Sequence, residues 1–200
     1  MKIGLIAYRG GNVRSIRSAL EALGADVVYS ADPSMLEPCA GLIFPGVGAA
    51  LPAVEDLHAR GLWAWLPRWE KPFLGICLGM QLMGSYLAEG GVPGLGIFPF
   101  EVEAFCQAPR ALHIGWNLVS PHRPDPLWEG LRAPFYAYFV HGYRAPVGPY
   151  SLAEATYGET FSAAVRKDLF WGVQFHPEKS GRIGLTLLSN FLRVCASYQE

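Results

Sequence analysis

The stretch PFLGICLGMQLMGSYL, residues 72–87, decides the fold because it predicts a short apolar strand that runs directly into an amphipathic helix. A single cysteine, Cys77, lies at the junction, with Gly75 and Gly79 two positions to either side. The glycines leave room for a sharp turn that a β-carbon would crowd, so Cys77 can adopt a strained conformation with its sulfur exposed. This arrangement predicts a nucleophile elbow in which sulfur replaces oxygen.

The helix after this turn is expected to begin at Leu78. Its free backbone N–H groups and the positive end of its dipole would favour the thiolate and lower the pKa of Cys77. The same N–H groups can hold a developing oxyanion. The alternative is a small buried cysteine that closes a strand, as free cysteines often do.

The composition narrows the classes of protein to consider. The 200 residues suit one domain of ordinary size. A formal net charge of −1, without runs of like charges, argues against binding to nucleic acid or to an anionic membrane surface. Charged residues make up 16% of the chain against a typical value of about 25%, so we expect another subunit to cover part of the surface.

No membrane span, secretion signal or metal site is expected. The longest uncharged run, residues 39–54, contains prolines and glycines and is shorter than the roughly 20 residues that a spanning helix needs. Residues 1–12 lead into an apolar strand and a glycine pair without a cleavage site, so we expect a cytoplasmic protein. The cysteines form no C-x-x-C pair, which argues against a zinc site and a disulfide framework. Besides Cys77, we expect the cysteines to be core residues, namely Cys39, Cys106 and Cys195.

Apolar strands alternate with helical periods in the first half of the chain. The expected strands cover residues 2–7, 26–30, 41–46 and 72–77, and the expected helices cover residues 13–23, 51–60 and 78–88. Asn12 can cap the first of these helices and Gly24 can end it. Strands that are apolar throughout are typical of a parallel sheet with helices on both faces.

The second half of the chain changes character after residue 96. Strand-like pieces separated by Pro and Gly turns predict hairpins over residues 98–105, 113–120, 135–141 and 151–157. One more strand is expected at residues 170–177, followed by a closing helix over residues 181–197. We therefore assign residues 1–200 to one α/β domain, with a mostly parallel central sheet, flanking helices and a small antiparallel extension.

A thiolate needs a base, and His176 stands apart from the other histidines because it ends an expected strand. The carboxyl ends of parallel strands share one edge of the sheet, so His176 and Cys77 can meet there. Glu178 lies near enough to turn back toward the imidazole and to hold the tautomer that leaves Nε2 free. An isolated H-x-E sequence is often structural, but beside the elbow it predicts a Cys-His-Glu triad.

The sequence PGVG, residues 45–48, directly follows an expected strand. Gly46 and Gly48, on either side of Val47, allow backbone N–H groups to point into a site without obstruction by side chains. The loop can hold an oxyanion, or it can be a tight turn between strand and helix. The sequence leaves these two interpretations open.

The segments GICLGMQ, PGVG and FHPEKS, in their order and spacing, resemble the class I glutamine amidotransferases. Within this family the chain is most similar to the glutaminase subunits of imidazole glycerol phosphate synthase, which belongs to histidine biosynthesis. The similarity extends over the whole chain, through GGNVRSIRSAL near the start, HIGWN at residues 113–117 and FYAYFVHGY at residues 135–143. The resemblance implies a flavodoxin-like fold and a triad of cysteine, histidine and glutamate.

The resemblance also implies a role for each matching position. Cys77 would be the nucleophile, His176 the base and Glu178 its orienting partner. The glutamine substrate would be bound by Gly46, Gln81, His141, Gly142 and Tyr143. Backbone N–H groups of Leu78 and of the loop at Val47 and Gly48 would hold the oxyanion.

A partner protein is implied as well, because glutamine hydrolysis alone has no use. Ammonia would pass through a tunnel to a barrel-shaped cyclase subunit, which would close an imidazole ring on a phosphoribulosyl formimino substrate. No metal or organic cofactor is called for. The positions expected to face the cyclase are Asn12, Trp116, Asn117 and Lys179.

The chain departs from the family pattern at three positions. The family commonly has aspartate and glycine where this chain has Ala7 and Arg9, and often a hydroxyl residue in place of Gly142. Two alternatives stay open: a glutaminase subunit for anthranilate or pyridoxal phosphate synthesis, and a flavodoxin-like stress or binding protein with a reactive cysteine. The sequence VQFHPEKS argues against the second, because such a protein does not need a His-x-Glu at the end of a late strand.

Overall fold

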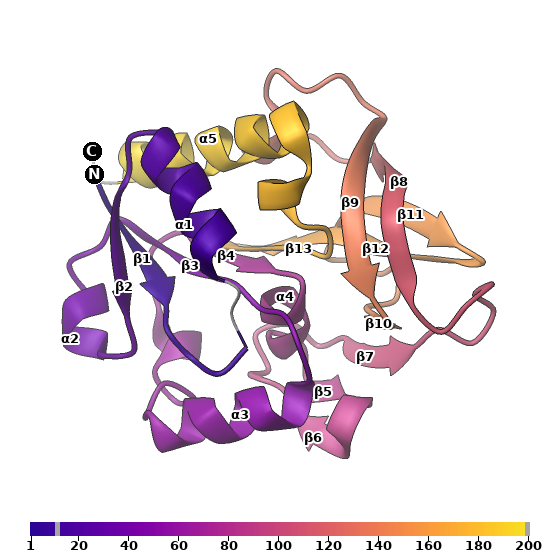
Figure 1. Ribbon diagram of the computed structural model, residues 1–200, viewed down its shortest axis with the longest axis horizontal. Helices are drawn as coiled ribbons and strands as arrows, with labels where there is room; N and C mark the ends of the chain where they lie inside the picture. The colour runs from indigo at the N-terminus through magenta and orange to yellow at the C-terminus, as the bar shows by residue number, and fades with distance from the viewer. Residues whose placement is uncertain (11–12, 199–200) are drawn as a thin grey trace.

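A mixed sheet of nine strands forms the centre of the structure, a computed structural model that describes residues 1–10 and 13–198 (Figure 1). The strand order is β2-β1-β3-β4-β13-β12-β11-β8-β9. From β2 to β13 neighbouring strands are parallel, and from β13 to β9 they are antiparallel. The strands are β1 (Lys2–Ile6), β2 (Asp26–Ser30), β3 (Gly41–Phe44), β4 (Phe73–Ile76), β8 (His113–Pro121), β9 (Phe135–His141), β11 (Ser151–Tyr157), β12 (Glu159–Lys167) and β13 (Phe170–Val173).

Helices cover both faces of the parallel half of this sheet. In Figure 1, α1 and α5 lie above the sheet and α3 lies below it. The helices are α1 (Val13–Ala22), α2 (Pro33–Leu36), α3 (Ala50–Ala59), α4 (Leu78–Leu82) and α5 (Gly181–Tyr198). Short 3-10 turns are η1 (Leu66–Arg68), η2 (Glu89–Gly91), η3 (Pro126–Trp128) and η4 (Pro177–Lys179). A small second sheet has the order β10-β7-β5-β6 and consists of β10 (Tyr143–Arg144), β7 (Glu101–Ala104), β5 (Tyr86–Leu87) and β6 (Val92–Pro93).

Two hydrophobic clusters flank the sheet because successive residues of a strand point to opposite faces. Leu5 and Ile43 belong to the cluster that includes the buried side of α5, whereas Ile6 and Phe44 belong to the cluster that includes α3. These central strands are buried on both sides, which explains why their sequences are apolar throughout. The expectation of a helix-covered parallel sheet is therefore confirmed.

The expected elements agree with the structure at most positions. β2, β9 and β11 have the expected bounds, and the antiparallel part is larger than expected because it also includes β12. Cys39 and Cys195 are buried as expected, but the expectation for Cys106 is wrong because it is exposed on the loop after β7. No helix in the described part of the chain is long and apolar enough to cross a membrane.

The helix expected over residues 78–88 is wrong beyond Leu82, where α4 ends. Ser85 N–H donates to the Phe100 carbonyl, and residues 86–87 then form β5 beside β7. A β-carbon at Gly84 would lie 2.8 Å from the Phe100 carbonyl oxygen, so the glycine permits this close approach of two backbones. Backbone pairing with a segment distant in the sequence therefore ends the helix early.

We predict that Gly79→Ala destabilises the fold, because a β-carbon there would lie 1.9 Å from the Phe44 carbonyl oxygen. Overpacking against backbone typically lowers the free energy of unfolding by about 1–3 kcal/mol. The matched control is Gly148→Ala, since no atom lies within 4 Å of the added carbon at that position. Urea unfolding of the two variants measures the difference, and equal unfolding midpoints would show that α4 does not need a glycine at this contact.

Candidate active site

Cys77 lies at the sharp turn between β4 and α4 that the flanking glycines predict. Its backbone has φ 52° and ψ −111°, a conformation that residues with a side chain rarely adopt. The expectation of an exposed sulfur is wrong, because Cys77 is only 5% exposed. The Val140 carbonyl oxygen and the Gln174 side-chain amide nitrogen each lie 3.6 Å from the sulfur. The nucleophile candidate is therefore enclosed at the bottom of a cavity.

His176 and Glu178 lie beside this cysteine, after the end of the neighbouring strand β13. His176 Nδ1 is 2.8 Å from Glu178 Oε1, and the histidine is fully enclosed. His176 Nε2 is buried and makes no hydrogen bond of ordinary length within the described chain. Burial lowers the pKa of His176, but the nearby Cys77 sulfur and the Glu178 carboxylate more than offset this effect and raise it to about 10. The structure brings together the three residues of the predicted triad.

Ser180, which the sequence analysis missed, fixes the segment that carries His176. Its hydroxyl donates to the His176 carbonyl oxygen at 2.7 Å and accepts from Tyr138 N–H at 3.0 Å. His176 N–H in turn donates to the Tyr138 carbonyl oxygen at 2.9 Å. The backbone of His176 is thereby attached to the edge strand β9. In the sequence, Ser180 is only a small residue after the H-x-E pattern, and no local signal marks this contact.

A cavity of about 630 Å³ lies in front of Cys77. Of the residues that the sequence analysis placed in the active site, all but two contribute to its wall. Gly46 lies instead against Leu78, and Glu178 lies against His176 Nδ1. The residues of the wall that had been predicted are Val47, Gly48, Cys77, Leu78, Gln81, His141, Gly142, Tyr143, His176 and Lys179. In the described part of the chain, no group of three or more His, Cys, Asp or Glu side chains could hold a metal ion.

The PGVG loop reaches the cavity with the N–H group of Val47 already bonded within the protein. Val47 N–H donates to the Gly10 carbonyl oxygen, and Leu78 N–H donates to the Gly46 carbonyl oxygen at 3.3 Å. Gly48 has φ +99°, a value that glycine adopts readily and other residues do not. Two of the three expected oxyanion donors, Val47 N–H and Leu78 N–H, are therefore bonded within the protein in this arrangement of the loop.

Gln81 lies one helical turn after Cys77 and is nearly buried. Its Nε2 donates to the Tyr143 carbonyl oxygen at 2.9 Å and to Gln174 Oε1 at 3.0 Å. Both amide hydrogens are therefore used inside the protein. Gln81 Oε1 is the atom that remains to accept a hydrogen bond from a ligand.

Glu89 is a second residue of the cavity wall that the sequence analysis missed. Its carboxylate accepts from Ala50 N–H at 3.2 Å, and burial raises the pKa of Glu89 despite this hydrogen bond. A half-buried carboxylate suits the ammonium group of an amino acid. The residue was overlooked because it follows the segment that had been expected to be helical, whereas it begins the turn η2.

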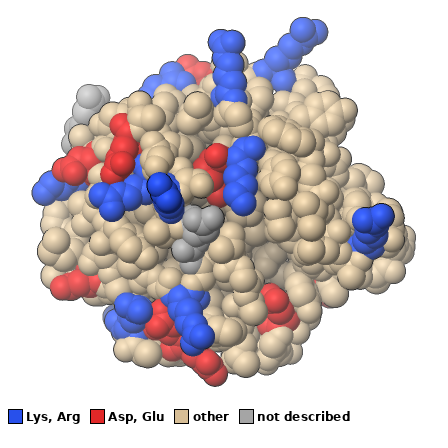
Figure 2. All heavy atoms as spheres, in the orientation of Figure 1, with Lys and Arg blue, Asp and Glu red and all other residues tan. Residues whose placement is uncertain are grey.

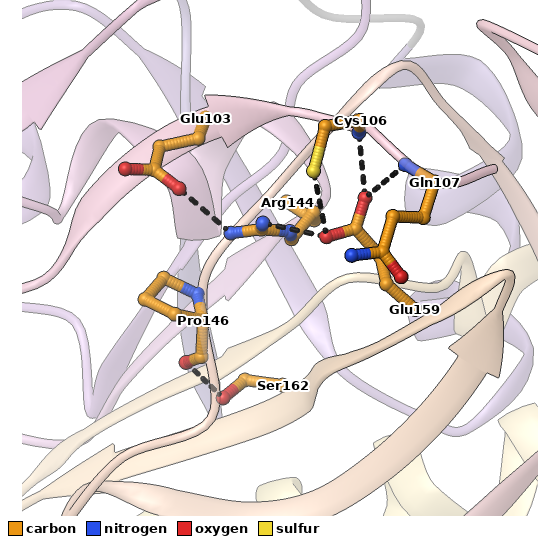
Figure 3. Close-up of polar contacts among 7 residues, drawn as sticks. All are labelled: Glu103, Cys106, Gln107, Arg144, Pro146, Glu159 and Ser162. Atoms are coloured by element: carbon orange, nitrogen blue, oxygen red, sulfur yellow. Dashed lines mark hydrogen bonds and ion pairs between the residues drawn. The ribbon is translucent and has the colours of Figure 1, made fainter.

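An ion-pair cluster supports the loop that carries Ala111 and Leu112 to the cavity wall. Figure 3 shows the Arg144 guanidinium between Glu103 and Glu159, at 3.0 and 2.7 Å respectively. Glu159 also accepts from the backbone N–H of Cys106 at 2.7 Å. These contacts fix the loop after β7, and the same loop brings Ala111 and Leu112 to the cavity wall.

The expected partner-facing residues differ in their surroundings. Trp116 is 56% exposed and packs edge-to-face with Tyr138, with ring centroids 5.9 Å apart. Lys179 is exposed at the mouth of the cavity. Asn117 is half-buried, and its amide bonds to the Thr156 carbonyl oxygen and to a buried histidine instead of pointing outward. Asn12 lies outside the described residues.

Comparison with known proteins agrees with this arrangement. A model of the family glutamine amidotransferase class-I matches residues 5–195. The imidazole glycerol phosphate synthase subunit HisH of Bacteroides fragilis is 42% identical over 199 residues, which cover 97% of this chain and 100% of the relative. The subunit of the same name from Nitratidesulfovibrio vulgaris is 43% identical over 205 residues, with 96% of both chains covered.

Solved structures show the same fold at low sequence identity. A structure described as a glutamine amidotransferase is 21% identical, with a TM-score of 0.75, and the match covers 97% of this chain and 98% of the other. A chain of PurLQS from Thermotoga maritima is 19% identical, with a TM-score of 0.72, and the match covers 100% and 99%. Family match, curated relatives and fold agree, and the chain therefore belongs to the class I glutamine amidotransferases and, within them, to the HisH subunits of imidazole glycerol phosphate synthase.

Proposed function

We propose that the chain hydrolyses glutamine to glutamate and ammonia through Cys77, His176 and Glu178. The observation that carries the proposal is the strained Cys77 at the bottom of a cavity, next to a histidine whose Nδ1 is held by Glu178 and whose Nε2 is unpaired within the described chain. The names of its relatives support a place in histidine biosynthesis as an enzyme subunit, and we propose that it acts in the cytoplasm. Glutamate release from glutamine, measured with and without a cyclase subunit, tests this function.

The chemistry begins with the thiolate of Cys77, which forms when His176 Nε2 takes the thiol proton. The sulfur attacks the side-chain amide carbon of glutamine. The imidazolium then donates its proton to the amide nitrogen, which leaves as ammonia when the C–N bond breaks. A water molecule, activated by the same histidine, then hydrolyses the thioester and releases glutamate. Glu178 stabilises the imidazolium in both steps, which is consistent with the raised pKa of His176.

The substrate pocket has polar groups suited to the two ends of glutamine. Gln81 Oε1 can accept from a nitrogen of the substrate, and the Glu89 carboxylate can pair with its α-ammonium group. The backbone of Gly142 and Tyr143 forms the adjacent wall, where Gly142 has no side chain that would fill the space.

The arrangement of the PGVG loop is consistent with a resting state. An oxyanion hole requires Val47 N–H to leave Gly10 and turn toward the cavity, together with Leu78 N–H. Glycines at positions 46 and 48 permit such a rotation of the peptide planes. Substrate and partner could then favour the productive arrangement by binding it more tightly, which is a population shift.

The outer face of β8 and β9 is the surface that we assign to a cyclase subunit. Ile114, Trp116 and Leu118 are exposed at alternate positions of β8, and Tyr136 is exposed on β9 opposite Leu118. In Figure 2 few charged side chains lie over this right-hand part of the molecule. An exposed apolar patch next to the cavity mouth is typical of a protein–protein interface. The cyclase would use the released ammonia to form imidazole glycerol phosphate and aminoimidazole carboxamide ribotide.

Cys77→Ser is predicted to reduce glutamine hydrolysis below detection, because a hydroxyl is a far weaker nucleophile in a site built for a thiolate. Binding to the cyclase and the ammonia-dependent cyclase reaction are expected to survive. Glutamate release and cyclisation with added ammonia measure the two activities separately. Cys106→Ser is the matched control because Cys106 is outside the cavity wall. Substantial glutaminase activity in Cys77→Ser would remove Cys77 from the role of nucleophile.

The base and its orienting partner should differ in importance. By comparison with other triads, His176→Ala is expected to lower kcat by roughly 10⁶-fold and Glu178→Gln by roughly 10⁴-fold. The reason is that the first change removes the proton acceptor, whereas the second only weakens its orientation and charge. His122→Ala should change little, because that ring bonds to the Ser151 carbonyl outside the site. Equal kcat values for the two triad variants would contradict these roles.

The isolated chain should be a poor glutaminase that its partner activates. Loss of one oxyanion donor typically lowers the rate by about 10²–10³-fold, so we expect a gain of this order when the cyclase binds. Trp116→Ala and Lys179→Ala should weaken binding and activation. The controls are Tyr29→Ala and Lys2→Ala, at exposed positions of β2 and β1 on the opposite side of the sheet. Glutamine turnover is measured for the chain alone and for each complex. Full activity of the isolated chain, or normal activation of both interface variants, would disprove this scheme.

A further inference from the structure

A continuous series of buried and partly buried hydrogen bonds connects Asn117 on β8 with the sulfur of Cys77. It passes from Asn117 through two histidines and the Tyr143 carbonyl to two glutamines and ends at the nucleophile. We propose that this series has one fixed polarity, meaning that the donor and the acceptor of every hydrogen bond in it are determined. This polarity makes Gln174 a donor to the sulfur and Gln81 an acceptor for the substrate. His113 and Asn117 are then positioning residues of the active site.

The backbone fixes the polarity at the Asn117 end. Asn117 Nδ2 donates to the Thr156 carbonyl oxygen at 2.8 Å, and Oδ1 accepts from Leu118 N–H at 2.8 Å. A carbonyl oxygen can only accept and an N–H can only donate, so the amide can lie in one orientation only. Nδ2 therefore faces His113 Nε2, 3.2 Å away, and this ring nitrogen must accept.

The two histidines pass this polarity on because each is neutral. Burial lowers the pKa of His113 to about 4 and that of His141 to about 3, so each ring has one donor and one acceptor at neutral pH. His113 must then carry its hydrogen on Nδ1 and donate to His141 Nε2 at 2.9 Å. His141 carries its hydrogen on Nδ1 as well and donates to the Tyr143 carbonyl oxygen at 2.8 Å. The Tyr143 carbonyl oxygen can only accept a hydrogen bond, so it requires the same direction of donation that Asn117 sets at the other end of the series.

The same carbonyl orients the two glutamines. Gln81 must present Nε2, not Oε1, to the Tyr143 carbonyl oxygen, and its second hydrogen then meets Gln174 Oε1. Gln174 is completely buried, and its remaining group, Nε2, lies 3.6 Å from the Cys77 sulfur. A donor at this position stabilises a thiolate, whereas a reversed amide would place an oxygen against it. The polarity thus favours the reactive form of the sulfur and leaves Gln81 Oε1 toward the cavity.

The first test determines the tautomers directly in the full chain, without reference to activity. Nitrogen-15 NMR of the imidazole rings at pH 7 is expected to show both His113 and His141 as neutral rings with hydrogen on Nδ1. The His113→Asn and His141→Asn variants, each of which lacks one imidazole, assign the two sets of signals. Hydrogen on Nε2 of either ring, or a charged ring, would overturn the proposal, and this result does not depend on whether the chain hydrolyses glutamine.

The second test measures kinetics in the complex and rests on the proposed function. His113→Leu removes the donor to His141, whereas His113→Asn can keep an N–H near the position of Nδ1. We expect His113→Leu to raise KM for glutamine by roughly threefold to tenfold, the usual effect of one hydrogen bond, and His113→Asn to retain most of the affinity. Equal KM values for the two variants would show that the polarity of this position is irrelevant.

The donor role of Gln174 has its own measurement. Gln174→Met keeps the length and the burial of the side chain but removes the donor, so alkylation of Cys77 by iodoacetamide should move to higher pH and kcat should fall. Gln174→Glu keeps an acceptor for Gln81 and places a carboxylate near the sulfur, so the same shift should be larger. An unchanged alkylation profile in both variants would overturn the role of Gln174, while loss of glutaminase in the wild-type complex would instead refute the proposed function.

Discussion

The contact between α4 and the end of β3 holds the conformation on which the site depends. Cys77 has a positive φ, a conformation that costs a residue with a side chain about 1–3 kcal/mol. The packing of the backbone on both sides of the turn holds it in this conformation. Gly79 lies directly against the Phe44 carbonyl, and Gly75 lies against the backbone of Gly79. The same contact places Leu78 N–H next to the Gly46 carbonyl, so the turn and the PGVG loop are parts of one packed unit.

The parallel and antiparallel halves of the sheet contribute differently to the site around Cys77. β4 and β13 are parallel neighbours in which Ile76 pairs with Val173, so the chain leaves both strands at the same edge and brings Cys77 near His176. The antiparallel half then closes the site from the side. β9 provides the Val140 carbonyl near the sulfur and, through Tyr138, the hydrogen bonds that hold the backbone of His176. Tyr138, a residue of the exposed face, is therefore bonded to the segment that carries His176.

The sequence was sufficient to predict the position of a site residue where a local pattern of residues has one physical cause. The glycines around Cys77 and the position of His176 after a strand indicated which residues meet at the edge of the sheet. Glu89, Gln174 and Ser180 could not be found in this way, because their roles depend on backbone groups far away in the sequence. The early end of α4 could not be predicted for the same reason, since Ser85 N–H after the helix donates to the Phe100 carbonyl, some fifteen residues further along the chain.

The exposed face of β8 and β9 also has a consequence for the chain before assembly. β9 is the last strand of the sheet, and the apolar side chains beside it are exposed in the isolated subunit. Surfaces of this kind promote self-association and aggregation when no partner covers them. With the proposed cyclase interface on this face, the solubility of the free subunit would depend on its concentration relative to its partner, and synthesis of both subunits in matched amounts would keep the pool of uncovered chains small.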